Sequence, residues 1–290
     1  MNDMPRITQE MINLYDEYTH VTLDRAGFLD RLTRLVGSPE VARSIAALIE
    51  ANKASAAIVA ENDTRLKTQS VTFGENMTGY LVMPAGVTGK LPAVMVVHEN
   101  RGLVPHIKDV VRRVALEGFL ALGPDFLAPD GGTPEDEEQG REMIGKLDRG
   151  KVVADALAAI DFLKSHPNSN GNVGAVGFCW GGGIVNAVAV AAGDRLKAGV
   201  PYYGAQPKAE DVGKIKAEMM LHYAGEDERI NAGIPAYKEA LEKNGTKHQI
   251  FVYDGAQHAF NNDTTAARYD KKSADLAWSR TIPFLKQKLT

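Results

Sequence analysis

The sequence predicts an α/β fold: a mainly parallel sheet with helices on both faces, preceded by a helical extension. Three observations support this class. From about residue 70 onward, short apolar runs alternate with segments of helical length and pattern. Residues 91–98 (LPAVMVVH) are continuously apolar, which is typical of a strand buried on both faces. The first 60 or so residues show only helical periodicity. We therefore divide the chain into an extension, residues 1–62, and an α/β domain, residues 63–290.

Composition excludes several classes of protein. The 290 residues include 33 basic and 37 acidic side chains, so no basic face for nucleic acid is expected. One cysteine rules out an intramolecular disulfide. No apolar run reaches the roughly 18 residues of a membrane helix, and the charged N-terminus does not resemble a secretory signal. We expect a cytoplasmic protein with no membrane partner; the sequence leaves its oligomeric state open.

The extension shows one amphipathic helix in detail. Its apolar face and its glycine stop are Phe28, Leu32, Leu35, Val36 and Gly37. Ser38-Pro39 then predicts a second start, for a helix from Glu40 toward Ala60. The segment contains no cluster of chemically reactive side chains. We therefore expect a helical cap packed on the α/β domain rather than a partner-binding module.

The α/β domain begins with a predicted hairpin, residues 71–73 and 79–83, and continues with alternating strands and helices. An acidic loop rich in glycine and proline is expected over residues 124–138. The other expected strands are 91–98, 119–123, 173–177, 198–203, 219–223 and 249–253. The expected helices are 107–117, 151–165, 182–192, 234–243 and 266–289.

The strand expected over residues 173–177 leads into the most informative segment, GFCWG at residues 177–181. A strand, a Gly-x-Cys-x-Gly turn and a helix form the nucleophile elbow of α/β-hydrolases, with cysteine in the place of serine. We expect bulk at Gly177 or Gly181 to collide with neighbouring backbone. The helix N-terminus would favour the thiolate of Cys179. The alternative is a buried structural cysteine, which this context disfavours.

An acid and a base follow in the order that α/β-hydrolases use. Asp227 comes after an apolar strand in the segment AGEDE, where Glu226 and Glu228 are its competitors. His258 is the one histidine of seven in a loop after the last strand. His258 would relay protons for Cys179, and Asp227 would orient its ring.

The loop HENRG, residues 98–102, supplies the fourth part of the predicted site. The backbone N–H groups of Asn100 and Trp180 are expected to form an oxyanion hole. Glu99 directly follows a fully apolar strand, so its carboxylate is expected to point into the site. The alternative is that Glu99 pairs with Arg101 or Arg112 and only holds the loop.

These pieces together resemble the dienelactone hydrolase family. The matching segments are VVHENRG, IKDVVRRVALEGFLALGPD, GFCWGGG, HYAGEDERINAG and YDGAQHAF, which span roughly residues 70–290. The resemblance implies a Cys-His-Asp triad of Cys179, His258 and Asp227. It also implies that Glu99 contacts the resting thiol and helps to activate it when substrate binds. The extension resembles a longer subgroup of the family.

The sequence departs from the family at the substrate's anion. Family members hold the carboxylate of the lactone with two arginines, one of them four residues past the catalytic histidine. Asn262 occupies that position here, and Arg141 is a candidate for the other arginine. We therefore expect dienelactone to be a poor substrate relative to a neutral ester or lactone.

The function predicted is hydrolysis of a small carboxylic ester or lactone, by acyl transfer from Cys179 to water, without a metal or organic cofactor. Arg101, Arg141 and Phe260 are the candidate substrate-binding residues. Two alternatives are a cysteine amidotransferase or peptidase-like enzyme, and a non-catalytic protein that binds a small molecule. The late histidine disfavours the first alternative, and the intact triad disfavours the second.

Overall fold

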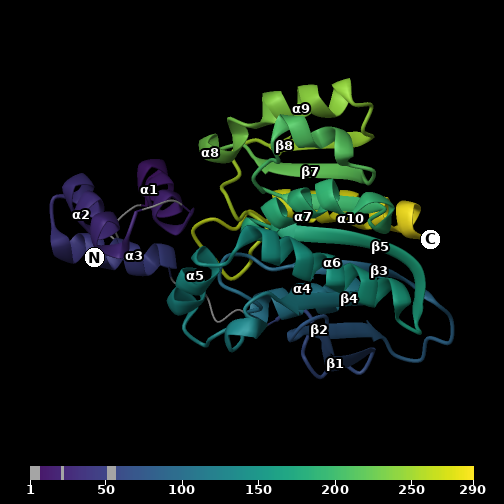
Figure 1. Ribbon diagram of the computed structural model, residues 1–290. Helices are drawn as coiled ribbons and strands as arrows, with labels where there is room; N and C mark the ends of the chain where they lie inside the picture. The colour runs from purple at the N-terminus through teal and green to yellow at the C-terminus, as the bar shows by residue number, and fades with distance from the viewer. Residues whose placement is uncertain (1–6, 21–22, 51–56) are drawn as a thin grey trace.

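An eight-stranded sheet forms the centre of the molecule in the computed structural model, which describes residues 7–20, 23–50 and 57–290 (Figure 1). The strand order is β1-β2-β4-β3-β5-β6-β7-β8. The β1–β2 and β2–β4 pairs are antiparallel and the others are parallel. The strands are β1 Leu66–Phe73, β2 Met77–Pro84, β3 Leu91–Val97, β4 Leu120–Asp125, β5 Ser169–Phe178, β6 Ala198–Tyr202, β7 Glu218–Ala224 and β8 His248–Tyr253.

Helices cover both faces of this sheet, as predicted. One apolar core lies under α4 and α10, and a second lies under α6, α7 and α9. No described helix is both long enough and apolar enough to cross a bilayer. The helices are α1 Gln9–His20, α2 Arg25–Val36, α3 Pro39–Glu50, α4 Pro105–Leu116, α5 Glu137–Gly145, α6 Arg149–Ser165, α7 Trp180–Ala191, α8 Glu228–Asn231, α9 Ile234–Lys243 and α10 Lys271–Leu289.

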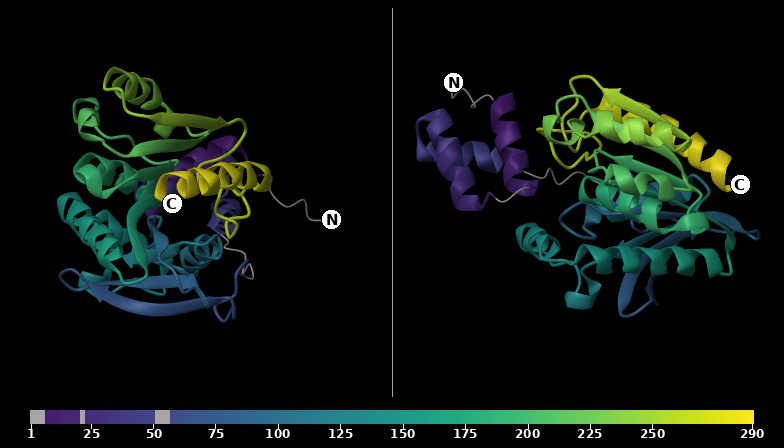
Figure 2. Two further views of the ribbon diagram at one scale, coloured as in Figure 1. Left: turned by 90° about the vertical axis from the view of Figure 1, so that its right-hand side faces the viewer. Right: turned by 45° about the horizontal axis from the view of Figure 1, so that its top comes forward.

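The first three helices form a group with its own small core. Phe28 and Leu32 of α2 are fully buried in it, and Tyr18 of α1 stacks on Phe28 with a centroid distance of 4.9 Å. Figure 2 shows this group beside the edge of the sheet at which β5 ends, rather than over either face. The expected cap therefore lies at one end of the α/β core.

Most predicted elements are present, with three differences. The closing helix expected from residue 266 is α10, which begins at Lys271. The helix expected from Glu40 toward Ala60 is α3, which ends at Glu50; residues 51–56 lie outside the described residues, and residues 57–60 are not helical. The loop expected over residues 124–138 ends at a helix that was not predicted, α5, which begins at Glu137. The side chain of Asp136 accepts hydrogen bonds from the N–H groups of Glu138 and Gln139, and the sequence analysis missed this cap. The glycine stop at Gly37 is confirmed, with a left-handed φ of 75°.

Candidate active site

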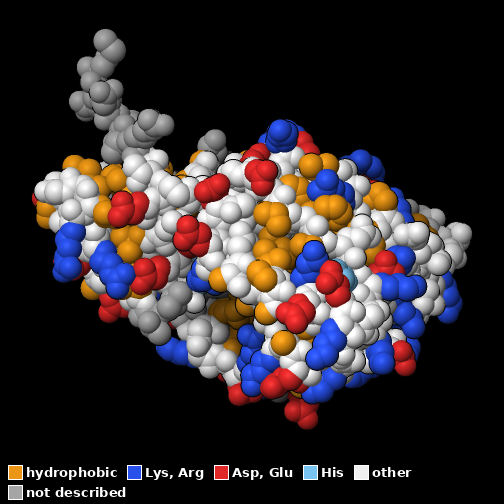
Figure 3. All heavy atoms as spheres, turned by 90° about the horizontal axis from the view of Figure 1, so that it is seen from above, with side chains coloured by type: hydrophobic (Ala, Val, Ile, Leu, Met, Phe, Trp, Pro, Cys, Tyr) orange, Lys and Arg blue, Asp and Glu red, His pale blue; other side chains and the backbone are white. Residues whose placement is uncertain are grey.

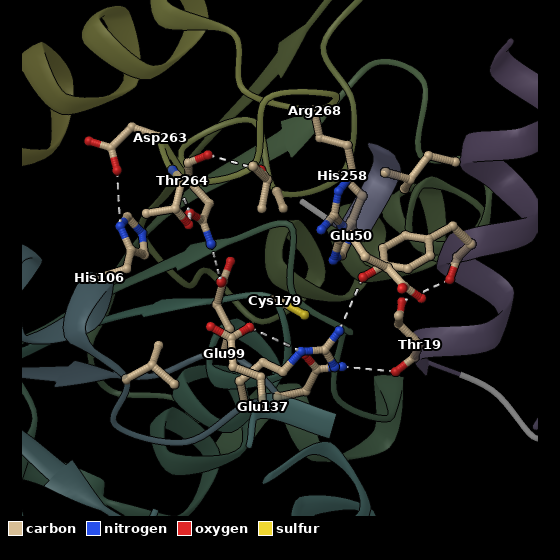
Figure 4. Close-up of a pocket in the computed structure, with 18 of the residues that line it drawn as sticks. Thr19, Glu50, Glu99, His106, Glu137, Cys179, His258, Asp263, Thr264 and Arg268 are labelled. Atoms are coloured by element: carbon tan, nitrogen blue, oxygen red, sulfur yellow. Dashed lines mark hydrogen bonds and ion pairs between the residues drawn. The ribbon is translucent and has the colours of Figure 1, made fainter. Parts of the chain in front are cut away.

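The predicted site residues meet at one edge of the sheet because parallel strands end there together. Asn100 follows β3, Cys179 follows β5, Asp227 follows β7 and His258 follows β8. Figure 4 shows Cys179, His258 and Glu99 facing the same cavity. Residues that lie up to 159 positions apart in the chain are therefore neighbours at this edge.

Cys179 occupies the strained turn that the sequence predicted. Its φ of 58° and ψ of −117° lie outside the regions that L-residues ordinarily adopt. A Cβ on Gly177 would lie 2.3 Å from the carbonyl oxygen of Gly181, and a Cβ on Gly181 would lie 2.4 Å from that of His98. The predicted collisions with backbone are confirmed. The turn places the buried thiol at the N-terminus of α7.

The two N–H groups expected to form the oxyanion hole lie beside this turn. Trp180 is the first residue of α7, and Asn100 lies in the loop after β3. Within the described part of the chain, neither N–H donates to a backbone carbonyl. The Asn100 side chain donates to the carbonyl of Thr19 at the end of α1, at 2.8 Å. The loop and the helical extension are therefore directly connected at the site.

Asp227 and His258 form a buried pair. The distance between His258 Nδ1 and Asp227 Oδ2 is 2.5 Å, and both side chains are almost completely buried. Burial by itself would lower the pKa of His258, but the charge of Asp227 and the nearby thiolate outweigh it and raise this pKa to about 10. Glu226 and Glu228, the competing acids, are exposed. The structure therefore brings Asp227 to the histidine.

The other ring nitrogen of His258 faces the thiol. Its Nε2 is buried and has no hydrogen-bond partner among the described residues. It lies within 4.8 Å of Cys179 Sγ. When Nδ1 donates to Asp227, Nε2 carries the lone pair that can accept the thiol proton.

Glu99 points into the site, as predicted, but its contacts differ from both expectations. Its Oε2 accepts a hydrogen bond from Asn262 Nδ2 at 2.6 Å, and its Oε1 is buried without a partner among the described residues. It pairs with neither alternative arginine: Arg101 contacts the hydroxyl of Tyr15, and Arg112 bonds to the carbonyl of Val59. The contact between Glu99 and the resting thiol stays a prediction. The structure assigns Asn262 a role that sequence reasoning missed, which is to hold this carboxylate.

The candidate substrate-binding residues lie in three different settings. Arg101 lines one cavity, and Arg141 lines a second one, where it pairs with Glu138 and lies over the ring of Tyr18. Phe260 lines neither cavity; it is fully buried among aromatic rings of the core. The loop turns the Phe260 ring inward, so the cavities give no support to the expected contact with substrate.

The two cavities meet at the thiol. Their volumes are about 470 Å³ and 650 Å³, and Figure 3 shows a recess where the N-terminal helices meet the rest of the molecule. The first includes Arg101 and Arg268 among its lining residues, and the second includes Ile184 and Ile230. Five residues line both: Thr19, His20, Asn100, Cys179 and His258.

His20, at the end of α1, is the largest omission of the sequence analysis. Its Nε2 lies 2.8 Å from Cys179 Sγ, and its ring lies 4.6 Å from that of His258 between centroids. Arg268 was also missed; it is buried in the first cavity and pairs with Asp16 of α1 at 3.3 Å. No local pattern marks either residue: His20 reaches the site only through the docking of α1, and Arg268 reaches it through the course of the loop between β8 and α10.

Comparison with known proteins identifies the family of this chain. Residues 77–289 match the dienelactone hydrolase family. A protein of Synechocystis named "Putative carboxymethylenebutenolidase" is 34% identical over 234 residues, which cover 74% of this chain and 94% of that protein.

Solved structures extend the agreement to three dimensions. The structure titled "Putative Dienelactone Hydrolase" from Klebsiella pneumoniae has a TM-score of 0.70 at 29% identity, over 77% of this chain and 99% of the other. The dienelactone hydrolase of Anabaena variabilis, at 24% identity, shares the fold with a TM-score of 0.59 over 78% and 100%. The chain therefore belongs to the dienelactone hydrolase family and is a hydrolase.

Proposed function

We propose that the protein hydrolyses a small carboxylic ester or lactone through Cys179, His258 and Asp227. One observation carries this proposal. A buried pair of 2.5 Å between His258 and Asp227 leaves the partnerless Nε2 of the histidine beside a cysteine on a strained turn. Nucleophile, base and orienting acid are arranged in this way in enzymes that form covalent acyl intermediates.

The reaction follows from these positions. His258 accepts the thiol proton, and the thiolate attacks the carbonyl carbon of the substrate. The N–H groups of Trp180 and Asn100 donate to the oxyanion, and the dipole of α7 stabilises negative charge at Cys179. His258 then protonates the leaving alkoxide. Water, deprotonated by the same ring, releases the acid and restores the thiol.

The first cavity supports a substrate that carries an anionic group. Arg101 lies near Glu137 and Arg268 pairs with Asp16, yet Arg101 Nη1 and Arg268 Nε are buried there without a hydrogen-bond partner among the described residues. An unpaired buried N–H group is costly, and a bound carboxylate would satisfy it. These two arginines lead us to replace the expectation, drawn from Asn262, that a neutral ester is preferred.

Replacing the nucleophile tests the reaction. Cys179→Ala should abolish hydrolysis of p-nitrophenyl acetate and of a lactone panel while it leaves the fold intact, and Cys179→Ser should retain little activity. Wild-type turnover by Cys179→Ala would refute the proposal. Turnover of glutamine or peptides, with none of esters, would favour an amidotransferase or peptidase. An iodoacetamide rate for Cys179 no faster than that of a free thiol would favour a non-catalytic binding protein.

A pair of esters tests the anionic substrate. We would compare p-nitrophenyl acetate with the p-nitrophenyl monoester of succinate, which adds a carboxylate to the acyl group. Arg268→Gln should raise KM at least about tenfold for the anionic ester alone, because a charged hydrogen bond contributes about 1.5–3 kcal/mol. Arg149→Gln, in the other cavity, is the matched control. Equal effects of Arg268→Gln on both esters would contradict the proposal.

A further inference from the structure

Three side chains that bind transition metals converge at the proposed nucleophile: His20, Cys179 and His258. Their donor atoms, two imidazole nitrogens and one sulfur, all lie within 4.8 Å of one another. We propose that these three residues form a binding site for a zinc-like divalent cation, and that the bound cation holds the hydrolase in an inactive state.

Both imidazole rings are oriented with Nε2 toward the sulfur. His258 Nδ1 is held by the Asp227 carboxylate at 2.5 Å, and His20 Nδ1 lies 3.0 Å from the backbone carbonyl of Asp16. An Nδ1–H that donates to an oxygen leaves the lone pair on Nε2. Metal-binding histidines are oriented by this same kind of outer hydrogen bond.

The Nε2 of His258 is available to a ligand. This atom is buried, in a side chain that is 1% exposed, and no described residue bonds to it. A buried polar atom without a partner is unfavourable, and either a substrate or a cation would satisfy it. The contact of His20 with the thiol adds a second nitrogen on the same sulfur.

The spacing fits a tetrahedral ion once the donor atoms shift by up to about 1.5 Å. Zinc binds sulfur at about 2.3 Å and nitrogen at about 2.0–2.1 Å, which places the donor atoms of a tetrahedral site about 3.3–3.6 Å apart. The distance from His20 Nε2 to Cys179 Sγ, now 2.8 Å, would have to widen by less than about 1 Å. His20 is the last residue of α1, so rotation of its side chain accomplishes this. The fourth position faces the two cavities, which all three residues line.

The donor set selects the kind of cation. One thiolate and two imidazoles favour Zn²⁺ or Co²⁺ over Mg²⁺ and Ca²⁺, which prefer oxygen ligands. Binding displaces the one proton that Cys179 and His258 share, releases it to the buffer from the sulfur or from Nε2, and forms a sulfur–metal bond, with no change of oxidation state. One proton per cation is therefore expected near neutral pH.

The third ligand distinguishes this chain from the family's catalytic core. The family match begins at residue 77, so His20 lies outside it. Cys179 and His258 alone offer two donors, and α1 supplies the third. Because the cation would occupy both the sulfur and the Nε2 needed for acyl transfer, its binding should stop hydrolysis. The inhibition rests on the proposed function, whereas the binding does not.

The experiment uses metal-free, full-length protein and three variants. Zn²⁺ affinity is measured by competition with a chromophoric chelator, and Co²⁺ binding by absorption, which reports both the thiolate bond and the tetrahedral geometry. His20→Gln keeps a hydrogen-bond acceptor but loses the imidazole ligand. His166→Ala, before β5 at the opposite edge of the sheet, is the matched control. Cys179→Ser tests the sulfur, and circular dichroism checks that each variant is folded.

We expect one site in the wild type, unchanged by His166→Ala. His20→Gln should weaken Zn²⁺ binding at least about 100-fold, because the loss of an outer-shell partner alone typically costs 10–100-fold and His20 would be a direct ligand. Cys179→Ser should lose the thiolate-to-cobalt band. Hydrolysis of p-nitrophenyl acetate should fall in step with Zn²⁺ occupancy and return with EDTA. Equal affinities of wild type and folded His20→Gln would overturn the site, as would the absence of a thiolate band. If Cys179→Ala abolishes hydrolysis in EDTA but wild type binds no Zn²⁺, the proposed function stands and this inference fails.

Discussion

Substituting Asp227 with asparagine keeps the shape of the side chain and removes its charge from the pair with His258. Asp227 is 5% exposed, so solvent cannot replace the lost charge. Burial favours the neutral ring of His258, but the carboxylate and the thiolate outweigh burial and hold its pKa at about 10. Asp227→Asn removes the carboxylate charge that raises the pKa of His258, whereas burial still lowers it. The pKa of His258 should therefore fall to the ordinary 6.5 or below.

The size of this effect follows from the shift. A fall from about 10 to 6.5 or below is at least about 3.5 pKa units, which corresponds to about 5 kcal/mol, or to a more than thousandfold loss of the ion pair between thiolate and imidazolium near neutral pH. We expect kcat/KM for p-nitrophenyl acetate to fall on the order of 10³-fold. The rate of iodoacetamide alkylation near pH 7 should also fall, and its midpoint should move to higher pH.

The assay compares full pH profiles of both rates. Glu226→Gln and Glu228→Gln are matched controls, because each removes one negative charge from an exposed side chain beside Asp227. Both controls should remain within about threefold of wild type, as surface charges contribute little. Profiles for Asp227→Asn that superimpose on those of wild type would refute the role of the pair. A loss confined to one of the glutamate variants would transfer that role to the glutamate.

Three further outcomes are expected. Glu99→Gln should speed alkylation of the free enzyme near neutral pH and slow ester turnover, because it removes a negative charge near the thiol; superimposable alkylation curves would leave Glu99 a purely structural role. Gly181→Ala should lower the free energy of unfolding by about 3 kcal/mol or more, because its Cβ would lie 2.4 Å from a backbone carbonyl oxygen that cannot move aside. Urea unfolding measures this loss, and an unchanged midpoint of the urea transition would contradict the prediction. The stability of wild type relative to Asp227→Asn should be greatest below pH 6.5 and decline as pH rises through about 10, because the pKa of His258 is raised in the folded state. Thermal melts of both proteins across pH 6–10.5 measure this difference in stability, and a difference that does not change with pH would argue against the ion pair.

The order of strands and helices could be predicted because it depends on local pattern. The apolar run that became β3 is buried on both faces, and the glycines around Cys179 mark a turn in which backbone atoms approach each other closely. The missed helix α5 had a local signal as well, since Asp136 caps it. Its acidic composition is also typical of a loop, so the sequence analysis did not predict a helix there.

Which residues touch at the site was predicted only in part. Chain order and strand ends led to Cys179, Asp227 and His258, because parallel strands deliver their following loops to one edge. The same reasoning placed Phe260 next to the substrate, and the structure buries it instead. The direction in which a loop turns one side chain depends on the rings packed around it, which no short segment encodes.

The sequence by itself determined the fold class, the strained cysteine turn and the order of the catalytic candidates, since strand burial, glycine sterics and connectivity are properties of short segments. Only the tertiary structure decided what surrounds the thiol. Docking of α1 brings His20 to Cys179 and Asp16 to Arg268, and the fold of the final loop brings Asn262 to Glu99. These contacts join residues that lie more than 150 positions apart in the chain, and they depend on the packing of whole elements rather than on any local pattern.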